Sequence, residues 1–392
     1  MSKLSRSAER VADVARRHCD AGAFASIEWL AVRDGREWLR GAVGMADPLN
    51  GAPLPDKPIY RIYSMTKPVI SSIAMMLVEE GLLRLYNPVA AYIPAFSKPE
   101  IISGDGSRRP ATRPMLVEQL MSHRSGLSYG FLTDCPAARL YRESNLRTGA
   151  GSLEQMIATI ASLPLASEPG AQWRYSVATD VLARIIEIVT GKSIRQVVAE
   201  RITGPLGLSD TGFQASDVSR LLPMFGNSNL DHLMEFAPGP QKLTPADVSA
   251  GYPASDPAFG RGGYGLFSTI DDYKVIAEFL ATGRSPSGDL MLSRKAVELM
   301  WANRVPPGQL PLAIGPVVMP GYGFSLAGRV MLDIGSGYWL TSPGECGWSG
   351  AASTFFLIDP KERVIALVMS QYLGSKVPLA DDMRNVIYSV LD

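Results

Sequence analysis

Strand-like segments occur at both ends of this chain of 392 residues, and mostly helix-like segments lie between them. Alternating and β-branched residues indicate strands at residues 26–32, 37–43, 322–332, 352–358 and 363–370. A chain with strands at both ends can close one sheet only if its termini meet. We therefore predict an α+β fold in which an antiparallel sheet is built from both termini and flanked by helices.

The predicted division of the chain follows from this pattern. Residues 1–86 and 286–392 are expected to form a discontinuous sheet subdomain, and residues 87–285 a mainly helical subdomain inserted into it. Ligand sites favour such interfaces, so we expect the functional site at the junction.

Ser64-Met65-Thr66-Lys67 places a hydroxyl and an ammonium group three residues apart, where a loop is expected to turn into a helix. Residues with this spacing share one helical face, so the amine can reach the hydroxyl. Pro68 supports a helix start here, because proline is tolerated near the first turn. The segment is a candidate for an activated serine. The alternative is that Ser64 only caps the helix and Lys67 is solvated.

Tyr175 follows a loop and precedes a predicted helix at 179–190. Its ordinary pKa, near 10, is too high for a base at neutral pH, but two neighbouring cations would stabilise the phenolate. Lys67 is the candidate for one of them. Alternatively, Tyr175 is a packed ring with a locally satisfied hydroxyl group.

The segment from Gly344 to Ala351 is rich in glycine and precedes a predicted strand. Glycine allows backbone to approach a ligand closely, and strand N–H groups here could bind an oxyanion. The alternative is a simple turn in which Trp348 is a core aromatic residue.

A rival nucleophile is Ser128 in Gly126-Leu127-Ser128-Tyr129-Gly130, which matches the elbow of α/β-hydrolases, with His232 downstream as a possible partner. The elbow requires a buried strand immediately before it, whereas residues 116–121 are helix-like. We therefore reject Ser128.

Composition excludes several classes of function. Lys plus Arg equals Asp plus Glu, at 38 each, so neither nucleic acid nor a membrane surface is expected as a partner. The three cysteines and three histidines lack metal-ligand spacing, so we expect reduced thiols, no metal and no cofactor, with His123 as a hydrogen-bonded structural residue. The N-terminus lacks an apolar signal core, which favours a cytoplasmic location.

Together these segments resemble the serine β-lactamase and penicillin-binding-protein superfamily, in its class C-like branch, and most closely bacterial family VIII carboxylesterases. The resemblance covers roughly residues 10–390. It rests on segments in the family's order: Tyr60–Pro68, Leu120–Leu127, Glu168–Tyr175, Thr190–Ser193, Pro205–Leu208, Gly262–Thr269 and Trp348–Gly350.

This resemblance implies roles for individual residues. Ser64 would be the nucleophile, Lys67 a general base or proton relay, and Tyr175 the partner base that protonates the leaving alcohol. The backbone N–H groups of Ser64 and Ala351 would form the oxyanion hole. Trp348, Ser349 and Gly350 would occupy the third motif on the strand that lines the site.

The sequence departs from the superfamily pattern at two recognition positions. Val177 stands where relatives that act on β-lactams or peptides have Asn, and Trp348 stands where they have Lys or His. A neutral aromatic lining favours small uncharged esters. We also expect Tyr129 and Phe131 to line the entrance, and Trp348 to form an acyl-side wall.

The sequence thus predicts a metal-free serine carboxylesterase acting through an acyl-enzyme on Ser64. One alternative is an acyltransferase or a β-lactamase-like amide hydrolase, which would use the same residues. Another is a non-catalytic scaffold that only binds its ligand. The natural substrate, acyl length, stereochemical preference, oligomeric state and origin of Lys67 basicity are left open.

Overall fold

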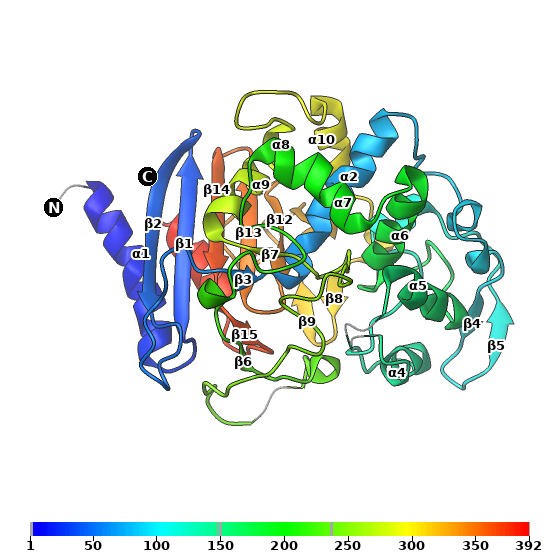
Figure 1. Ribbon diagram of the computed structural model, residues 1–392, viewed down its shortest axis with the longest axis horizontal. Coiled ribbons are helices and arrows are strands. Elements are labelled where there is room, and N and C mark those ends of the chain that lie inside the picture. Colours follow the sequence, from blue (N-terminus) through cyan, green and yellow to red (C-terminus); the bar gives the residue numbers. More distant parts are fainter. Residues whose placement is uncertain (1–2, 147, 149–150, 236–237, 392) are drawn as a thin grey trace.

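The computed structural model describes residues 3–146, 148, 151–235 and 238–391. Within these residues the central sheet has seven antiparallel strands, in the order β10-β11-β12-β13-β14-β1-β2 (Figure 1). The strands are β1 (Ser26–Arg33), β2 (Arg36–Gly44), β10 (Tyr322–Phe324), β11 (Arg329–Met331), β12 (Cys346–Gly350), β13 (Thr354–Asp359) and β14 (Val364–Met369).

The pairing of β1 with β14 joins the two ends of the chain. Glu28 lies opposite Met369 and Arg33 opposite Val364 in a continuous antiparallel register. The α+β fold with a sheet assembled from both termini is therefore confirmed.

Both faces of the sheet are covered by helices. On β1, Ile27 and Trp29 pack in a cluster with α1 (Lys3–Asp20) and α11 (Leu379–Tyr388), whereas Leu30 faces the larger core with α9 (Ile270–Thr282). Successive side chains of a strand point to opposite faces, so a central strand covered on both sides is apolar throughout. This explains why nearly all of β1 is buried.

Helix α2 (Thr66–Glu79) runs between the sheet and the helical part of the molecule (Figure 1). It contacts α6 (Ala178–Thr190), α9 and α10 (Arg294–Trp301). A helix packed on several sides is apolar all round rather than amphipathic, and residues 66–77 are all buried. Its polar side chains therefore lie in the interior.

The helical part occupies the opposite end of the molecule from α1 (Figure 1). Its helices are α3 (Val117–Met121), α4 (Pro136–Glu143), α5 (Leu153–Ser162), α6, α7 (Ile194–Val198) and α8 (Gly204–Leu206). Two-stranded pairs complete the fold: β3 (Tyr60–Arg61) with β7 (Phe267–Ser268), β4 (Glu100–Ile102) with β5 (Arg108–Pro110), β6 (Phe225–Gly226) with β15 (Tyr372–Leu373), and β8 (Leu312–Ile314) with β9 (Val317–Met319). Across the described residues, no helix combines the length and apolar character that crossing a bilayer requires.

The predicted single strand at 322–332 is wrong, because the chain reverses within it to form β10 and β11. Ser325 Oγ accepts hydrogen bonds from the N–H groups of Ala327 and Gly328, and Gly328 O accepts from Ser325 N. A serine that bonds its own backbone is a turn signal, but apolar residues on both sides conceal it.

The division into 1–86 plus 286–392 and 87–285 stays a prediction. Helix α9 lies within the second range, yet it packs against β1, β13 and β14.

A buried carboxyl group lies between the sheet and the β3 strand. Tyr60 Oη donates a hydrogen bond of 2.8 Å to Glu28 Oε2, and both residues are buried. Burial raises the pKa of Glu28 from 4.5 to about 7, although the bond from Tyr60 acts in the opposite direction. The folded protein therefore binds this proton more tightly than the unfolded chain does.

We expect the free energy of unfolding to fall as pH rises from 4.5 to 7, because the folded state must ionise Glu28 in a buried position. Glu28→Gln keeps the acceptor for Tyr60 and should reduce this fall by about 2–3 kcal/mol between pH 5 and pH 8. Urea unfolding at the two pH values measures it. Glu37→Gln, on the exposed strand β2, is the control. An unchanged pH dependence in Glu28→Gln would contradict the assignment.

Candidate active site

Ser64 lies in a short 3₁₀ turn, Tyr63–Met65, immediately before α2. Tyr63 has a φ of +44°, a left-handed conformation that is uncommon for a residue with a side chain. Such backbone strain occurs where the surrounding structure holds a residue in a required position. The N-cap of α2 is Met65, without a side-chain cap bond. The alternative in which Ser64 serves only as the helix cap is therefore wrong.

Lys67 is buried, with an exposed fraction of 3%. Its Nζ donates to Ser64 Oγ at 3.0 Å and to the Gly263 carbonyl oxygen at 2.7 Å. The ammonium also lies 4.6 Å from the ring centroid of Tyr175. The alternative of a solvated lysine is excluded by this burial.

Gly263 is itself held by α6. Asp180 Oδ1 accepts a hydrogen bond of 2.9 Å from Gly263 N, and a Cβ added to Gly263 would come within 2.6 Å of Asp180 Oδ2. Asp180 thus positions the Gly263 carbonyl group, which accepts a hydrogen bond from Lys67 Nζ. Sequence reasoning missed this residue, because an acidic residue in the first turn of a helix is usually explained by the helix dipole alone.

Tyr175 also contacts Ser64. Tyr175 Oη lies 2.6 Å from Ser64 Oγ, and Trp348 Nε1 donates to Tyr175 Oη at 3.2 Å. The sequence argument required two cations beside the phenol, and Lys67 is one of them. The second group that the structure brings to Tyr175 Oη is the neutral indole N–H of Trp348.

The ring of Tyr175 is enclosed by aromatic side chains. Tyr129, Trp348 and His123 have ring centroids 5.2, 5.4 and 4.7 Å from it. Burial lowers the pKa of His123 well below its usual value, and the charge of Lys67 adds to this. His123 Nδ1 lies 3.3 Å from Ser176 Oγ. The buried, hydrogen-bonded imidazole is therefore neutral.

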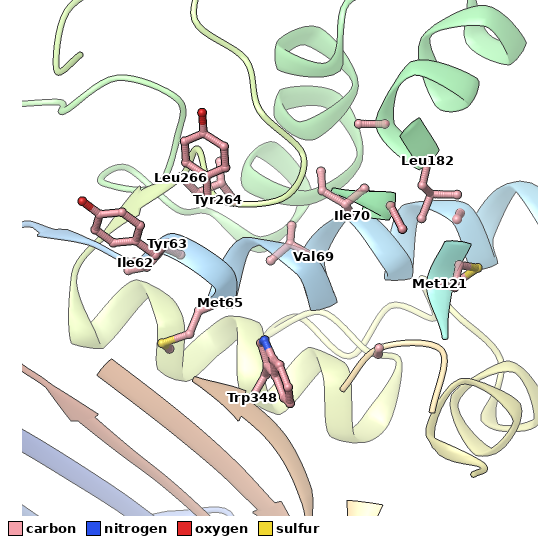
Figure 2. Close-up of a cluster of buried hydrophobic side chains, with 14 of the residues drawn as sticks. Ile62, Tyr63, Met65, Val69, Ile70, Met121, Leu182, Tyr264, Leu266 and Trp348 are labelled. Carbon is pink, nitrogen blue, oxygen red and sulfur yellow. The ribbon is translucent and has the colours of Figure 1, made fainter. Parts of the chain in front are cut away.

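Strand β12 brings Trp348, Ser349 and Gly350 to the site, and Ala351 follows directly after it. A Cβ at Gly350 would lie 2.4 Å from the Ile62 carbonyl oxygen, so only glycine permits this approach to the turn that carries Ser64. Figure 2 shows the Trp348 indole pointing toward the start of α2.

A cavity of about 420 Å³ opens beside Ser64. Its walls include Ser64, Tyr175 and all four predicted residues of β12 and its end. Tyr129 and Phe131 also line it, with their rings stacked at a centroid distance of 4.9 Å. The residues expected at the entrance therefore lie in the wall of this cavity. Apolar walls with a few converging polar groups are typical of ligand sites.

Ser128 has a different environment. It is fully buried, and its Oγ accepts a hydrogen bond of 3.0 Å from Arg174 Nε. No strand precedes it in the described residues 111–128, whereas an elbow requires one. His232 Nδ1 lies 2.8 Å from Glu235 Oε1. The G-x-S-x-G match is therefore a coincidence of sequence.

Sequence reasoning also missed a buried charged cluster: Arg329 and Arg384, which line the cavity, and Glu345, which lies beside them. These residues come from β11, α11 and the segment before β12, so no local spacing connects them. In the part of the chain that the structure describes, no group of three or more His, Cys, Asp or Glu side chains could hold a metal ion.

Comparison with known proteins identifies the family. A family model described as Beta-lactamase matches residues 11–388. Protein Rv1367c of Mycobacterium tuberculosis is 33% identical over 364 residues, covering 90% of this chain and 87% of that protein. Esterase EstB of Burkholderia gladioli is 26% identical over 383 residues, covering 92% and 90%.

Among solved structures, the chain is similar to EstCE1, described as a hydrolase with promiscuous acyltransferase activity. The TM-score is 0.81 at 26% identity, over 98% of this chain and 99% of that one. A match across nearly the whole chain, together with the shared architecture, leaves one conclusion. The chain belongs to the beta-lactamase family, and its resemblance to the serine esterase branch of that superfamily is confirmed.

Proposed function

We propose that this protein is a serine carboxylesterase that forms an acyl-enzyme on Ser64, in the manner of the family VIII esterases. One observation carries the proposal: Ser64 Oγ lies within hydrogen-bond distance of both Lys67 Nζ and Tyr175 Oη, at the wall of a largely apolar cavity. A nucleophile in contact with two proton-accepting groups is the arrangement that covalent catalysis requires.

The reaction proceeds in two halves. Ser64 Oγ attacks the ester carbonyl carbon, and its proton passes to the Lys67–Tyr175 pair. Tyr175 then returns the proton to the leaving alcohol as the C–O bond breaks, which leaves the acyl group on Ser64. Water attacks this acyl group, gives its proton to the same pair, and Ser64 leaves with that proton restored. Because the two groups interact closely, they titrate as a unit.

Trp348 assists by donating to Tyr175 Oη. An indole N–H is a donor only, so Tyr175 Oη must be the acceptor. Tyr175 Oη donates to Ser64 Oγ when it is protonated. As a phenolate beside the Lys67 ammonium, still accepting from Trp348, it is ready to remove the serine proton. Burial of Lys67 disfavours its charge, and this favours proton exchange between the two groups.

The N–H groups of Ser64 and Ala351 are proposed as the oxyanion hole. Both residues line the cavity, and the close approach of Gly350 to Ile62 brings the end of β12 beside the serine turn. Backbone donors in a fixed position stabilise the negative oxygen of the tetrahedral intermediate at no reorganisation cost.

The substrate class follows from the lining. Tyr129, Phe131 and Trp348 offer an aromatic wall beside the nucleophile, which suits the apolar part of a small ester. The esterase name of EstB supports an ester rather than a β-lactam as substrate. A cytoplasmic location stays a prediction.

Acyl transfer is the second candidate, because EstCE1 is described as a hydrolase with acyltransferase activity. The acyl-enzyme would be the same, with an alcohol in place of water as the acceptor. Product analysis with a competing alcohol distinguishes the two: transfer yields the new ester, whereas hydrolysis yields only the acid.

Ser64→Ala should abolish hydrolysis of a short p-nitrophenyl ester, and Ser128→Ala should retain it. The first removes the nucleophile, whereas the second removes only a hydrogen-bond acceptor for Arg174. Initial rates measure both, and a fluorophosphonate probe should label Ser64. Activity in Ser64→Ala together with its loss in Ser128→Ala would reverse the assignment. Failure of the probe to label a folded protein would favour the non-catalytic scaffold.

Trp348→Phe should lower kcat and kcat/KM together by about 10- to 100-fold, because the phenolate loses a donor worth about 1.5–3 kcal/mol. The acid limb of the pH–rate profile should move to higher pH. Trp173→Phe is the matched control, since Trp173 stacks on Tyr175 at 6.4 Å but its Nε1 has no hydrogen-bond partner among the described residues. Equal effects in the two variants would indicate that only ring packing matters.

Gly350→Ala should lower kcat/KM by about 100-fold or more, because the added Cβ forces β12 away from the serine turn. Gly308→Ala, where a Cβ meets no atom within 4 Å, is the control. Circular dichroism establishes that both variants fold. Wild-type activity in folded Gly350→Ala would argue against Ala351 N–H as part of the oxyanion hole.

A further inference from the structure

Two buried arginines form part of the wall of the cavity that contains Ser64. Arg329 begins β11 and is 7% exposed, and Arg384 lies on α11 and is 1% exposed. Guanidinium groups stay charged at all physiological pH values, so both charges are held away from bulk water. Buried charges in proteins are normally paired and hydrogen-bonded.

The pairing of these arginines within the protein is incomplete. Glu345 Oε1 lies 3.9 Å from Arg329 Nη2, and Glu345 Oε2 lies 3.8 Å from Arg384 Nε. Hydrogen-bonded ion pairs are about 1 Å shorter, at about 2.7–2.9 Å. Glu345 Oε2 instead accepts from Tyr322 Oη at 2.9 Å and from Thr341 Oγ1 at 2.7 Å.

Two further carboxylates lie near the cluster: Asp359, which accepts a hydrogen bond from Tyr388 Oη, and Asp381. Asp381 Oδ1 lies 3.9 Å from Arg384 Nη1, and the side chain of Asp381 is 39% exposed. Within the described part of the chain, Nε and Nη2 of both Arg329 and Arg384 lack a hydrogen-bond partner. Arg329, Arg384 and Glu345 thus carry two positive charges and one negative charge, and among the described residues Glu345 Oε1 likewise lacks a hydrogen-bond partner.

Aromatic rings hold the two guanidinium groups in place. Arg329 and Arg384 lie 4.8 and 5.9 Å from the ring centroid of Tyr322, and Arg384 lies 5.4 Å from that of Trp339. Both rings also line the cavity. Side chains positioned in this way lose little entropy when they bind an anion.

The strand register gives the backbone separation between the two ends of the cavity along β12. Arg329 lies opposite Gly347 on β12, whereas Ala351, beside Ser64, is four residues farther along. At about 3.3 Å per residue, these points are about 13 Å apart. One elongated substrate can therefore reach both, along the face of β12 that carries Gly347 and Ser349.

We propose that the far end of this cavity binds a carboxylate, and that the substrates are monoesters of dicarboxylic acids whose free acid group binds Arg329 and Arg384. This inference rests on the esterase function proposed above and specifies its substrate class. The reaction consumes the monoester and water and releases the alcohol and the dicarboxylate. Trp348 favours uncharged groups at the end of the cavity next to Ser64, whereas the acid group would bind at the other end.

The test compares p-nitrophenyl monoesters of dicarboxylic acids, from succinic to sebacic, with p-nitrophenyl esters of monocarboxylic acids of equal length. The wild-type protein should show a higher kcat/KM for the acid ester at one chain length or more. Arg329→Gln and Arg384→Gln should lower the ratio of acid to neutral kcat/KM by about tenfold or more, because each removes charged donors. Arg329→Lys should recover part of it.

Measuring both substrates on one preparation makes this ratio independent of the folded fraction. Arg363→Gln is the control and should leave the ratio unchanged. It also removes a positive charge, but the side chain of Arg363 is 73% exposed. An unchanged ratio in both buried-arginine variants, or a wild-type preference for neutral esters at every length, would overturn the proposal and leave the cluster a structural one.

Failure of the carboxylate-site proposal can be distinguished from failure of the esterase proposal. If the protein hydrolyses neither ester, the esterase proposal fails, and calorimetric titration of the wild-type protein with suberate and octanoate still tests the anion site. Tighter binding of suberate, lost in Arg329→Gln, supports it. Equal or absent binding of the two overturns it.

Discussion

The pairing of β1 with β14 is the constraint on which the rest of the structure depends. It places the N-terminal strands beside the C-terminal ones, in the order β12-β13-β14-β1. Helix α9 can then cover β1, β13 and β14 together, and α2 packs behind it. The serine turn at the start of α2 thereby meets the end of β12, and a site is formed from segments that lie far apart in the sequence.

At that site, the burial of Lys67 has a structural cause. Helix α2 is packed on several sides, so a lysine in its first turn is buried and must find partners inside. Gly263 and Ser64 provide them, and Asp180 holds the glycine. The contact between Lys67 and Ser64 therefore follows from the position of α2 rather than from the attraction between the two side chains.

The cavity has two chemically different ends. Near Ser64 it is aromatic, with Trp348 as both wall and hydrogen-bond donor. Near α11 it contains Arg329 and Arg384, whose charges are only loosely matched by Glu345. Trp348, which stands where relatives have Lys or His, therefore affects recognition of only one end of a substrate.

The sequence by itself determined the α+β class, the helices that follow Ser64 and Tyr175, and most strands, because hydrophobic periodicity and the S-x-x-K spacing are local properties. It also favoured Ser64 over Ser128 as the nucleophile, because the helix-like residues before Ser128 exclude the strand that an elbow requires. The break between β10 and β11 escaped it, because the turn at Ser325 lies between two strand-forming runs. The contacts of Tyr175 with Trp348, of Lys67 with Gly263, and of Arg329 and Arg384 with the ring of Tyr322 were decided only by the tertiary structure. Each joins elements that are distant along the chain, and only the packing of sheet and helices sets those distances.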